Sequence, residues 1–295
     1  MYLNHVRIED TFAEAFPMCA ARLVVTADRE EWAIIAARAA AGLAHSIVGC
    51  NCEADMAGNI APTQTPDGRP GVAVLLLTIS KEAMQQELLK RIGQGVLPTP
   101  TSACYNGLDS AETIAVGGKI RYFGDGYQSS KFLDGRRFWR VPVADGEFVV
   151  EESFGVTQGV GGGNLLIQAA SQSIALEAAQ AAVTAIRNTP NAIAPFPGGV
   201  CRSPSKIGSR YKTVIASTNH PFCPTLRAQV ESQLESTVQA VYEIVINGLS
   251  ESAVRQAMKA AMIAACLPGV VAITAGNYGG KLGPYHLHLH QILTE

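Results

Sequence analysis

Apolar residues along this chain alternate between short runs of strand length and longer stretches with helical spacing. Runs rich in Val and Leu predict buried strands at 21–27, 46–50, 72–78 and 96–101. Helices are expected at 30–42, which is Ala-rich, and at 81–92, where Ser80 is a residue type favoured at a helix N-terminus. Strand, helix, strand, strand, helix, strand is the order of a βαββαβ unit.

The second half of the chain repeats this order and part of the sequence. Strands are expected at 164–169, 192–196, 241–247 and 270–275, and helices at 172–187 and 250–266. Residues 8–12 resemble 150–154 at an offset of 142, whereas 75–90 resemble 245–260 at an offset of 170. Matches in a shared order with one change of offset indicate two copies, the second with an insertion.

The pattern therefore predicts an α+β fold of two similar ferredoxin-like (βαββαβ) lobes that arose by internal duplication. Strand-like stretches at 120–127, 137–143 and 147–151, separated by Asp-Gly turn dipeptides, predict an antiparallel meander that joins the lobes. We expect residues 1–147 to form an N-terminal α/β lobe with this connecting meander. Residues 148–295 are expected to form a C-terminal α/β lobe with an insertion at 197–240.

Composition narrows the class of protein. The formal net charge is -2, which excludes the basic footprint of a nucleic-acid binder. Only 16% of the residues are charged, below the roughly 25% of an average domain, and Ala and Gly are abundant. This low charge predicts that much of the surface is buried against other subunits. A monomeric mass in solution would contradict that expectation.

Neither the N-terminus nor the most apolar stretch resembles a membrane-targeting segment. Residues 1–12 are polar and lack the apolar core of a signal peptide. The stretch 257–276 contains Lys259, Pro268 and Gly269, so it is interpreted as a buried helix followed by a strand. The sequence predicts a cytoplasmic protein without a membrane anchor.

Three familiar kinds of site are not supported. The seven cysteines are an odd number and mostly isolated, which favours reduced structural thiols over disulfides or a metal site. The glycine run at 160–164 precedes a strand, whereas a phosphate loop needs strand, glycines and helix in that order. His286, His288 and His290 alternate, so in a strand they would share one face, and a half-exposed face is favoured over a metal site.

One carboxylate interrupts an apolar strand. Glu243 shares a strand face with Val241 and Val245 by alternation. Burial on that face would raise its pKa and suit it to general acid–base catalysis near neutral pH. The alternative is a Glu on a solvated sheet face, and the local pattern leaves both open.

The start of the insertion combines glycines, hydroxyls and cations. Gly198 and Gly199 allow close backbone approach, and Ser203 adds a hydroxyl. Four cations follow and no acid occurs between Asn191 and Gln229: Arg202, Lys206, Arg210 and Lys212. This segment is a candidate site for an anionic group, and a solvated loop is the alternative.

Several long strings resemble the formylmethanofuran:tetrahydromethanopterin formyltransferase family, and the resemblance covers nearly the whole chain. These strings are 123–128, 149–155, 194–199, 242–249 and 275–283. The resemblance implies two similar α/β lobes, a homotetramer, clefts for both substrates at subunit interfaces, and no metal or prosthetic group. It also implies that Glu243 is the acid–base residue.

The resemblance further implies a formamide donor, formylmethanofuran, and a secondary amine of tetrahydromethanopterin as acceptor. Attack gives a tetrahedral oxyanion, for which the backbone of Gly198 or Gly199, or the side chain of Asn164, are candidate donors. The four cations and Ser203 are candidates for binding the anionic tails of the two carriers.

The composition lacks the strong acidity of methanogen family members and is similar to the version in methylotrophic bacteria. That version belongs to a formyltransferase/hydrolase complex that releases formate. The alternatives are a non-catalytic carrier-binding subunit of such a complex, and a hydrolase that passes the formyl group to water. A hydrolase would need a metal or a nucleophilic triad, and no such constellation is found in the sequence.

Overall fold

Two long strands, β3 (Phe12–Thr26) and β11 (Ser153–Ala169), each contribute residues to both compact units of this mixed α+β protein. The computed structural model describes all 295 residues. Unit 1 comprises Met1–Pro17 and Val160–Glu295, and unit 2 comprises Met18–Gly159. The expected division at residue 147 would place the N-terminal residues with unit 2. They belong to unit 1 instead, because β2 (Val6–Ile8) pairs in parallel with β16 (Val270–Thr274).

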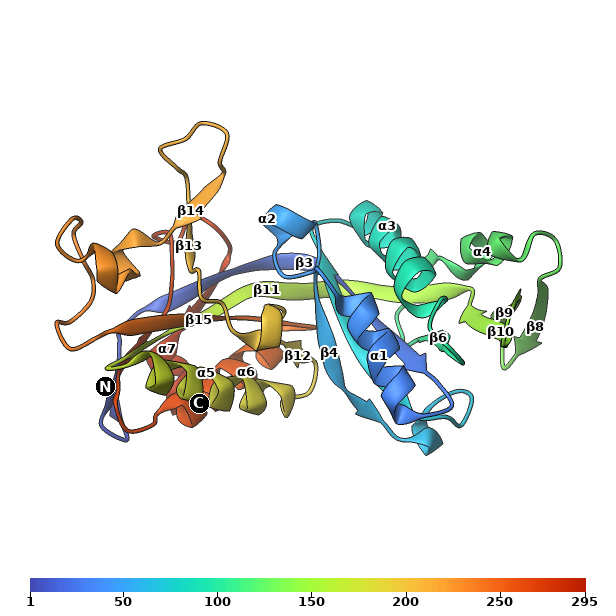
Figure 1. Cartoon of the computed structure of the whole chain (residues 1–295), viewed down its shortest axis with the longest axis horizontal. Coiled ribbons are helices and arrows are strands. Elements are labelled where there is room, and N and C mark those ends of the chain that lie inside the picture. Colours follow the sequence, from blue (N-terminus) through green and yellow to red (C-terminus); the bar gives the residue numbers. More distant parts are fainter. The chain divides into compact units, whose positions relative to one another are not determined.

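In unit 2, the central strand β3 lies between β5 (Gly71–Thr78) and β6 (Ala103–Asn106), and β4 (Glu53–Ile60) pairs with the far side of β5. Helices α1 (Glu30–Ala41) and α3 (Lys81–Arg91) cover one face of this sheet (Figure 1). Leu23, Leu76 and Leu88 are fully buried in the core between them. Ser80 caps α3 by accepting the Ala83 N–H, as predicted.

Two predicted strands of unit 2 are helical turns. Residues 46–50 form α2 (Ile47–Cys50), which ends where Asn51 adopts a left-handed φ of 57°. Residues 96–101 follow a π-helical turn, η2 (Ile92–Val96), that continues α3. A Cβ on Gly95 would lie 2.9 Å from the backbone nitrogen of Ala40, so this turn packs directly on α1. Ile92 and Val96 are buried by this helix packing, which strand-like composition alone does not distinguish.

The meander of unit 2 is correctly predicted only in its second part. β8 (Ser129–Leu133), β9 (Arg136–Val143) and β10 (Gly146–Glu151) are antiparallel and joined at Asp-Gly turns. The predicted strand at 120–127 is wrong, because α4 (Gly117–Ile120) and the 3-10 turn η3 (Arg121–Gly124) lead into this region instead. Helix α4 begins where the N–H groups of Val116 and Gly117 both donate to the Glu152 carbonyl, at 2.8 and 3.0 Å.

In unit 1, β11 lies between β15 (Ala240–Gly248) and β16. Helices α5 (Gln172–Arg187) and α6 (Glu251–Ala265) pack side by side on one face of these strands (Figure 1). Leu165, Ile244 and Ile273 are fully buried under them. The predicted strand at 192–196 is only the two-residue β12 (Ala192–Ile193). β17 (Tyr285–His288) and α7 (Leu289–Thr294) end the chain.

In each unit, the central strand pairs with its two neighbouring strands at equivalent positions. In unit 2, Val24 lies opposite Ala73 on one side and Tyr105 on the other. In unit 1, Leu166 lies opposite Glu243 and Thr274. The correspondence of Val24 with Leu166, and of Ala73 with Glu243, has the offsets of 142 and 170 found in the sequence. The side chains at these positions all lie on the sheet face away from the helices, because the alternate positions enter the cores.

On that face of unit 2, a partly buried hydrogen-bond network surrounds Asp67. Its Oδ2 accepts hydrogen bonds from Thr26 Oγ1 at 2.6 Å, Arg69 Nε at 2.8 Å and the Tyr105 hydroxyl at 3.0 Å. Burial alone would raise the pKa of Asp67, but the hydrogen bonds from Thr26 and Arg69 and the charge of Arg69 outweigh it and lower the pKa below its usual range.

We expect Asp67→Asn to destabilise unit 2 by about 2 kcal/mol at pH 7, because the variant removes one of the two carboxylates, Asp67 and Asp28, that pair with the partly buried guanidinium of Arg69. The pKa of Asp67 is lower in the folded protein than in the unfolded protein, where it is near 3.9, so its carboxylate stabilises the fold above about pH 3.9. This stabilisation is lost as the pH falls through the folded pKa. Urea unfolding followed by tryptophan fluorescence tests this, since both tryptophans, Trp32 and Trp139, belong to unit 2. The difference in the free energy of unfolding between wild type and Asp67→Asn should shrink at pH 3. Equal urea midpoints of the two proteins at pH 7 would contradict the prediction.

Candidate functional site

Glu243 lies on β15, on the sheet face away from α5 and α6. Its neighbours Ile244 and Ile246 enter the core under the helices, whereas Glu243 and Val245 are half-buried on the opposite face. Cys201 forms an antiparallel bridge with Glu243: the Cys201 N–H donates to the Glu243 carbonyl at 2.8 Å, and the Glu243 N–H donates back at 2.9 Å. The predicted face is therefore correct, and the start of the insertion lies beside this carboxylate.

Two weakly acidic groups lie near the Glu243 carboxylate. Burial, followed by the charge of Glu243, raises the pKa of the Cys201 thiol, which also forms a side-chain hydrogen bond with Glu243. Burial, followed by the same charge, raises the pKa of the Tyr278 hydroxyl. Both groups are therefore neutral at physiological pH, and the Tyr278 hydroxyl donates its proton to the Ser205 carbonyl at 3.4 Å. A carboxylate among neutral donors is suited to proton transfer.

The loop that carries Tyr278 is fixed by buried side chains of unit 1. The Glu14 carboxylate, only 2% exposed, accepts the N–H of Tyr278 and, at 2.9 Å, that of Leu282. Asn277 Nδ2 donates to Thr11 Oγ1 at 3.0 Å. These contacts hold residues 277–282 in one conformation and so fix the position of Tyr278.

Asn164 fixes the beginning of the same loop. Its Oδ1 accepts the Gly276 N–H at 2.7 Å, and its Nδ2 donates to the Gly276 carbonyl at 3.1 Å. Only the second N–H of Nδ2 is left for a substrate. The side chain predicted as a substrate contact is thus first a support for the loop.

The two glycines of the insertion adopt left-handed conformations, with φ of 65° at Gly198 and 84° at Gly199. A Cβ on Gly199 would lie 2.6 Å from Val183 Cγ1 and Cγ2 of α5, so no larger residue fits. The Gly199 N–H donates to the Phe196 carbonyl at 2.7 Å. This bond occupies the donor that Gly199 was expected to offer to an oxyanion.

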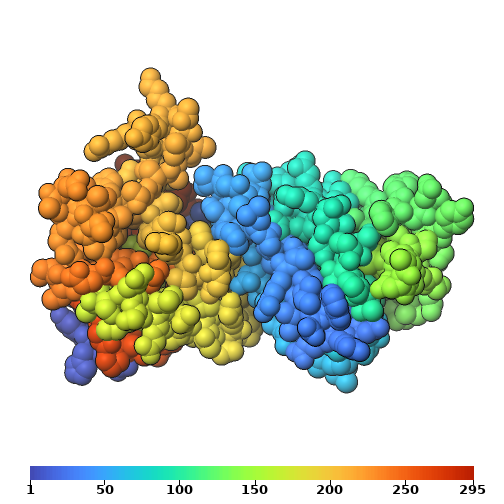
Figure 2. Space-filling model, viewed as in Figure 1, coloured from blue at the N-terminus to red at the C-terminus, as the bar shows by residue number.

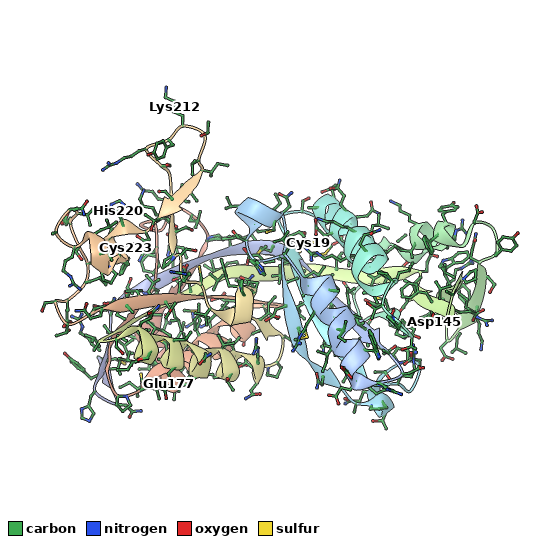
Figure 3. All side chains as sticks on the ribbon, viewed as in Figure 1. Cys19, Asp145, Glu177, Lys212, His220 and Cys223 are labelled. Carbon is green, nitrogen blue, oxygen red and sulfur yellow. The ribbon has the colours of Figure 1, made fainter.

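The four cations of the insertion are not gathered at one place. Arg202 and Ser203 are exposed directly after Cys201, and Ser203 Oγ lies 3.7 Å from the Cys201 thiol. Lys206 lies on β13 (Ser205–Ile207), which pairs with β14 (Ala216–Thr218). Arg210 and Lys212 are exposed in the turn between these strands; Figure 2 shows this hairpin projecting from the rest of unit 1, and Figure 3 shows Lys212 at its tip. Only Arg202 and Ser203 are adjacent in sequence to the Cys201–Glu243 bridge.

The largest cavity, of about 1040 Å³, lies in unit 2 and includes Arg22, Asn106 and Phe132 in its lining. On that sheet face, the register position that corresponds to Glu243 is Ala73. Unit 1 carries a carboxylate at this register position and unit 2 does not, and the cavities of unit 1 are smaller.

The remaining candidate ligands form no common site. His286 and His288 lie on β17 with ring centroids 4.9 and 5.1 Å from that of Phe12, but His290 begins the helix α7 region and its Nε2 is 2.8 Å from the Ile8 carbonyl. The expectation that all three share a strand face is therefore wrong for His290. No group of three or more His, Cys, Asp or Glu side chains is placed to bind a metal ion. All seven cysteines are free, and no helix is long and apolar enough to span a membrane.

The glycine run at 160–164 lies inside β11, where the pairing with β15 shifts between Val160 and Gly163. Gly162 takes a φ of 96° at this bulge, and a Cβ there would lie 2.9 Å from the Glu14 carbonyl. The glycines thus serve strand geometry, in agreement with the rejection of a phosphate loop.

A mixed α+β fold with a half-buried carboxylate on the sheet face away from the helices is consistent with an enzyme. Residues 1–143 match the family formylmethanofuran-tetrahydromethanopterin formyltransferase, and residues 146–292 match the family described as its proximal lobe. The chain belongs to the formylmethanofuran–tetrahydromethanopterin formyltransferase family.

Individual relatives agree over their full length. The formyltransferase of Methylococcus capsulatus is 50% identical over 99% of this chain and 100% of its own, and that of Methanopyrus kandleri is 49% identical with the same coverage. The solved Methanosarcina barkeri enzyme superposes with a TM-score of 0.95 at 46% identity, covering 99% of this chain and 100% of that one. A chain of the Methylorubrum extorquens formyltransferase/hydrolase complex with methylofuran has a TM-score of 0.96 at 46% identity, covering 99% and 98%.

Three site residues were missed from the sequence. Cys201 was counted only as a structural thiol, although it opens the cationic segment. Tyr278 lies in the string 275–283 that carries the family resemblance, which is the one signal that could have singled it out. Glu14 lies in the string 8–16, which also resembles the family, but its role was not visible because its partners are contributed by the other end of the chain.

Proposed function

We propose that this chain transfers a formyl group between formylmethanofuran and tetrahydromethanopterin, in either direction, as a step of one-carbon metabolism. The observation that carries the proposal is the position of Glu243 beside the Cys201 thiol and near the Tyr278 hydroxyl, in a chain that belongs to this family over its full length. A non-catalytic carrier-binding role is not favoured, because it gives no reason for this arrangement.

In the proposed reaction, the amine nitrogen of the acceptor attacks the formyl carbon, and the carbonyl electron pair moves onto oxygen to give a tetrahedral oxyanion. Glu243 accepts the proton that this nitrogen loses. The bond from carbon to the donor nitrogen then breaks, the carbonyl re-forms, and Glu243 returns the proton to the departing nitrogen. Glu243 ends the cycle as it began, and the Cys201 thiol orients its carboxylate throughout.

Binding both carriers in one orientation supplies much of the expected rate acceleration. For the oxyanion we propose the Gly198 backbone N–H and the second N–H of Asn164 Nδ2; Gly199 contributes the turn, since its own N–H is used. Arg202 and Ser203, with Lys206, Arg210 and Lys212 along the projecting hairpin, remain candidates for the anionic carrier tails.

Further proposals concern architecture and assembly. Matching pairings at offsets of 142 and 170 support the duplicated ferredoxin-like lobes. The domain division into residues 1–147 and 148–295 stays a prediction. We propose a homotetramer that acts without metal or prosthetic group. The Methylorubrum extorquens relative is named as one subunit of a formyltransferase/hydrolase complex, which supports association with other subunits. A cytoplasmic location stays a prediction.

A direct assay tests the reaction. Purified, metal-stripped protein is mixed with formylmethanofuran and tetrahydromethanopterin, and both formyl-tetrahydromethanopterin and formate are measured. Transfer without formate release is expected. Formate release by the isolated chain would favour a hydrolase, and no transfer by folded, oligomeric protein would refute the proposed function.

A further inference from the structure

The edge strand β8 of unit 2 is exposed on both of its faces. All five residues of Ser129–Leu133 are exposed, including the apolar side chains of Phe132 and Leu133. The opposite edge strand of this unit, β4, is buried or half-buried at six of its eight positions. β8 pairs with β9 alone and ends the sheet, as Figure 1 shows. A strand of this kind is a template to which another extended segment can add.

The backbone of β8 offers hydrogen-bonding groups along its free edge. The turn Asp134–Gly135 has positive φ at both residues, 50° and 76°, and closes on the pair Leu133 and Arg136. In an antiparallel ladder, alternate residues turn their N–H and C=O groups toward the partner strand. Ser130 and Phe132 therefore turn theirs away from β9, toward the free edge. An added strand would be held by these groups whatever its sequence.

Guanidinium groups and aromatic rings alternate beside this edge, over one face of β9. The Arg137 Cζ lies 5.3 Å from the ring centroid of Phe132 and 5.7 Å from that of Trp139. The Arg121 Cζ lies 4.3 Å from the Trp139 centroid and 4.8 Å from that of Tyr122. A guanidinium stacked on a ring keeps the N–H groups at its rim available for a carboxylate. The exposed Arg137 is therefore held ready to bind an acidic side chain beside the edge strand.

The segment that contains this stack is cationic in a chain that is slightly acidic. Residues 117–140 contain six Lys or Arg against two Asp, whereas the whole chain has a net charge of -2. Arg136 pairs with Glu151, and Arg140 pairs with Glu147. Four cations of the segment form no ion pair: Lys119, Arg121, Lys131 and Arg137. An excess of unpaired cations around a free strand edge favours an acidic partner.

A small cavity of about 440 Å³ adjoins the stack. Its lining includes Lys119, Arg121, Arg137, Trp139 and Glu152. The Glu152 carboxylate accepts the indole N–H of Trp139, so it is already engaged. Three cations thus line the cavity against one hydrogen-bonded carboxylate, and the cavity suits an anionic side chain.

We propose that the free edge of β8 binds an extended acidic segment of a different kind of subunit, which adds to the sheet as a strand and places carboxylates on the Arg137 side. A second copy of this chain is not favoured, because edge-to-edge pairing would bring two cationic segments together, and an edge charge such as Lys131 commonly opposes such pairing. The segment needs acidic side chains at alternate positions, since these point to one face. The proposal rests on the association with other subunits proposed above and does not depend on formyl transfer.

The test measures binding of a short synthetic peptide, in which Glu alternates with Thr, by calorimetry at low salt. Arg137→Gln removes the stacked cation, and Ser130→Pro removes an N–H of the free edge without removing a bond to β9. Arg38→Gln is the matched control, because Arg38 is an exposed cation of α1 in the same unit that forms no ion pair. We expect the Kd to rise roughly tenfold or more in Arg137→Gln and in Ser130→Pro, and to stay unchanged in Arg38→Gln.

Two altered peptides separate the side-chain and backbone contributions. A peptide with Gln in place of Glu should bind roughly tenfold more weakly or worse, because it lacks the charges. A peptide that keeps every Glu but is N-methylated at alternate residues should also bind more weakly, because it cannot complete a ladder with β8. This second comparison uses the unaltered protein, so it remains decisive even if Ser130→Pro does not fold.

Equal binding of the Glu and Gln peptides, equal binding by wild type and Arg137→Gln, or no binding to the wild type would each overturn the proposal. Dissociation of the oligomer by either edge variant, measured by sedimentation, would place a second copy at this edge and would also overturn it. Formyl transfer should continue at the wild-type rate in both variants, which lie outside the proposed catalytic site. If the wild type binds the peptide but transfers no formyl group, the edge assignment stands and the proposed function fails.

Discussion

Replacing Glu243 by Gln is expected to lower kcat by roughly 10² to 10⁴, the range typical of a lost general acid–base group. The amide has nearly the same shape and keeps the strand pairing with Leu166 and Cys201, but it cannot accept the proton of the attacking nitrogen. Substrate binding should change little, so the effect should fall on kcat. Steady-state transfer kinetics and an unfolding curve measure both parts.

The matched control is Glu177→Gln, an exposed glutamate on α5 in the same unit (Figure 3). It should leave kcat and stability unchanged. Near wild-type turnover in Glu243→Gln would remove Glu243 from the mechanism. A parallel loss of activity and stability would instead indicate a structural role for its carboxylate.

The second large effect is expected for Glu14→Ala. This buried carboxylate accepts the N–H groups of Tyr278 and Leu282, and its removal leaves two donors unpartnered at about 1–3 kcal/mol each. The loop should loosen and Tyr278 should no longer be held near Glu243. We expect a loss of about 2–4 kcal/mol in stability and a roughly 10- to 100-fold lower kcat.

Glu14→Gln provides a graded comparison, because its amide oxygen can still accept one of the two N–H groups. It should lie between wild type and Glu14→Ala in both stability and kcat. Glu177→Ala serves as the exposed control for truncation. If Glu14→Ala were destabilised without any loss of kcat in the folded protein, the loop would not be part of the catalytic arrangement.

Sequence patterns predicted the elements whose periodicity is strong and failed where local composition was ambiguous. The helix at 172–187 and the strand at 72–78 were predicted nearly to the residue. The wrong strands at 46–50, 96–101 and 120–127 are short segments without a clear period. Before residues 96–101, the close packing of Gly95 against the α1 backbone favours a helical turn over a strand. Such contacts depend on the assembled fold and leave no periodic signal.

The candidate site was predictable in its centre but not in its surroundings. Glu243 stands out because a charge interrupts an apolar strand, and alternation gave its face. Its supports are distant in sequence: Glu14 and Tyr278 are 264 positions apart. Gly199 was expected to donate to an oxyanion, but its N–H closes the turn on Phe196.

The pH dependence of kcat/KM for wild type and Glu243→Gln tests the central claim, that one carboxylate carries the proton, most directly. A general base must be ionised to act, so wild-type kcat/KM should fall as the pH is lowered and Glu243 becomes protonated. That acid limb should be absent from the residual activity of Glu243→Gln. An identical acid limb in both proteins would show that another group carries the proton.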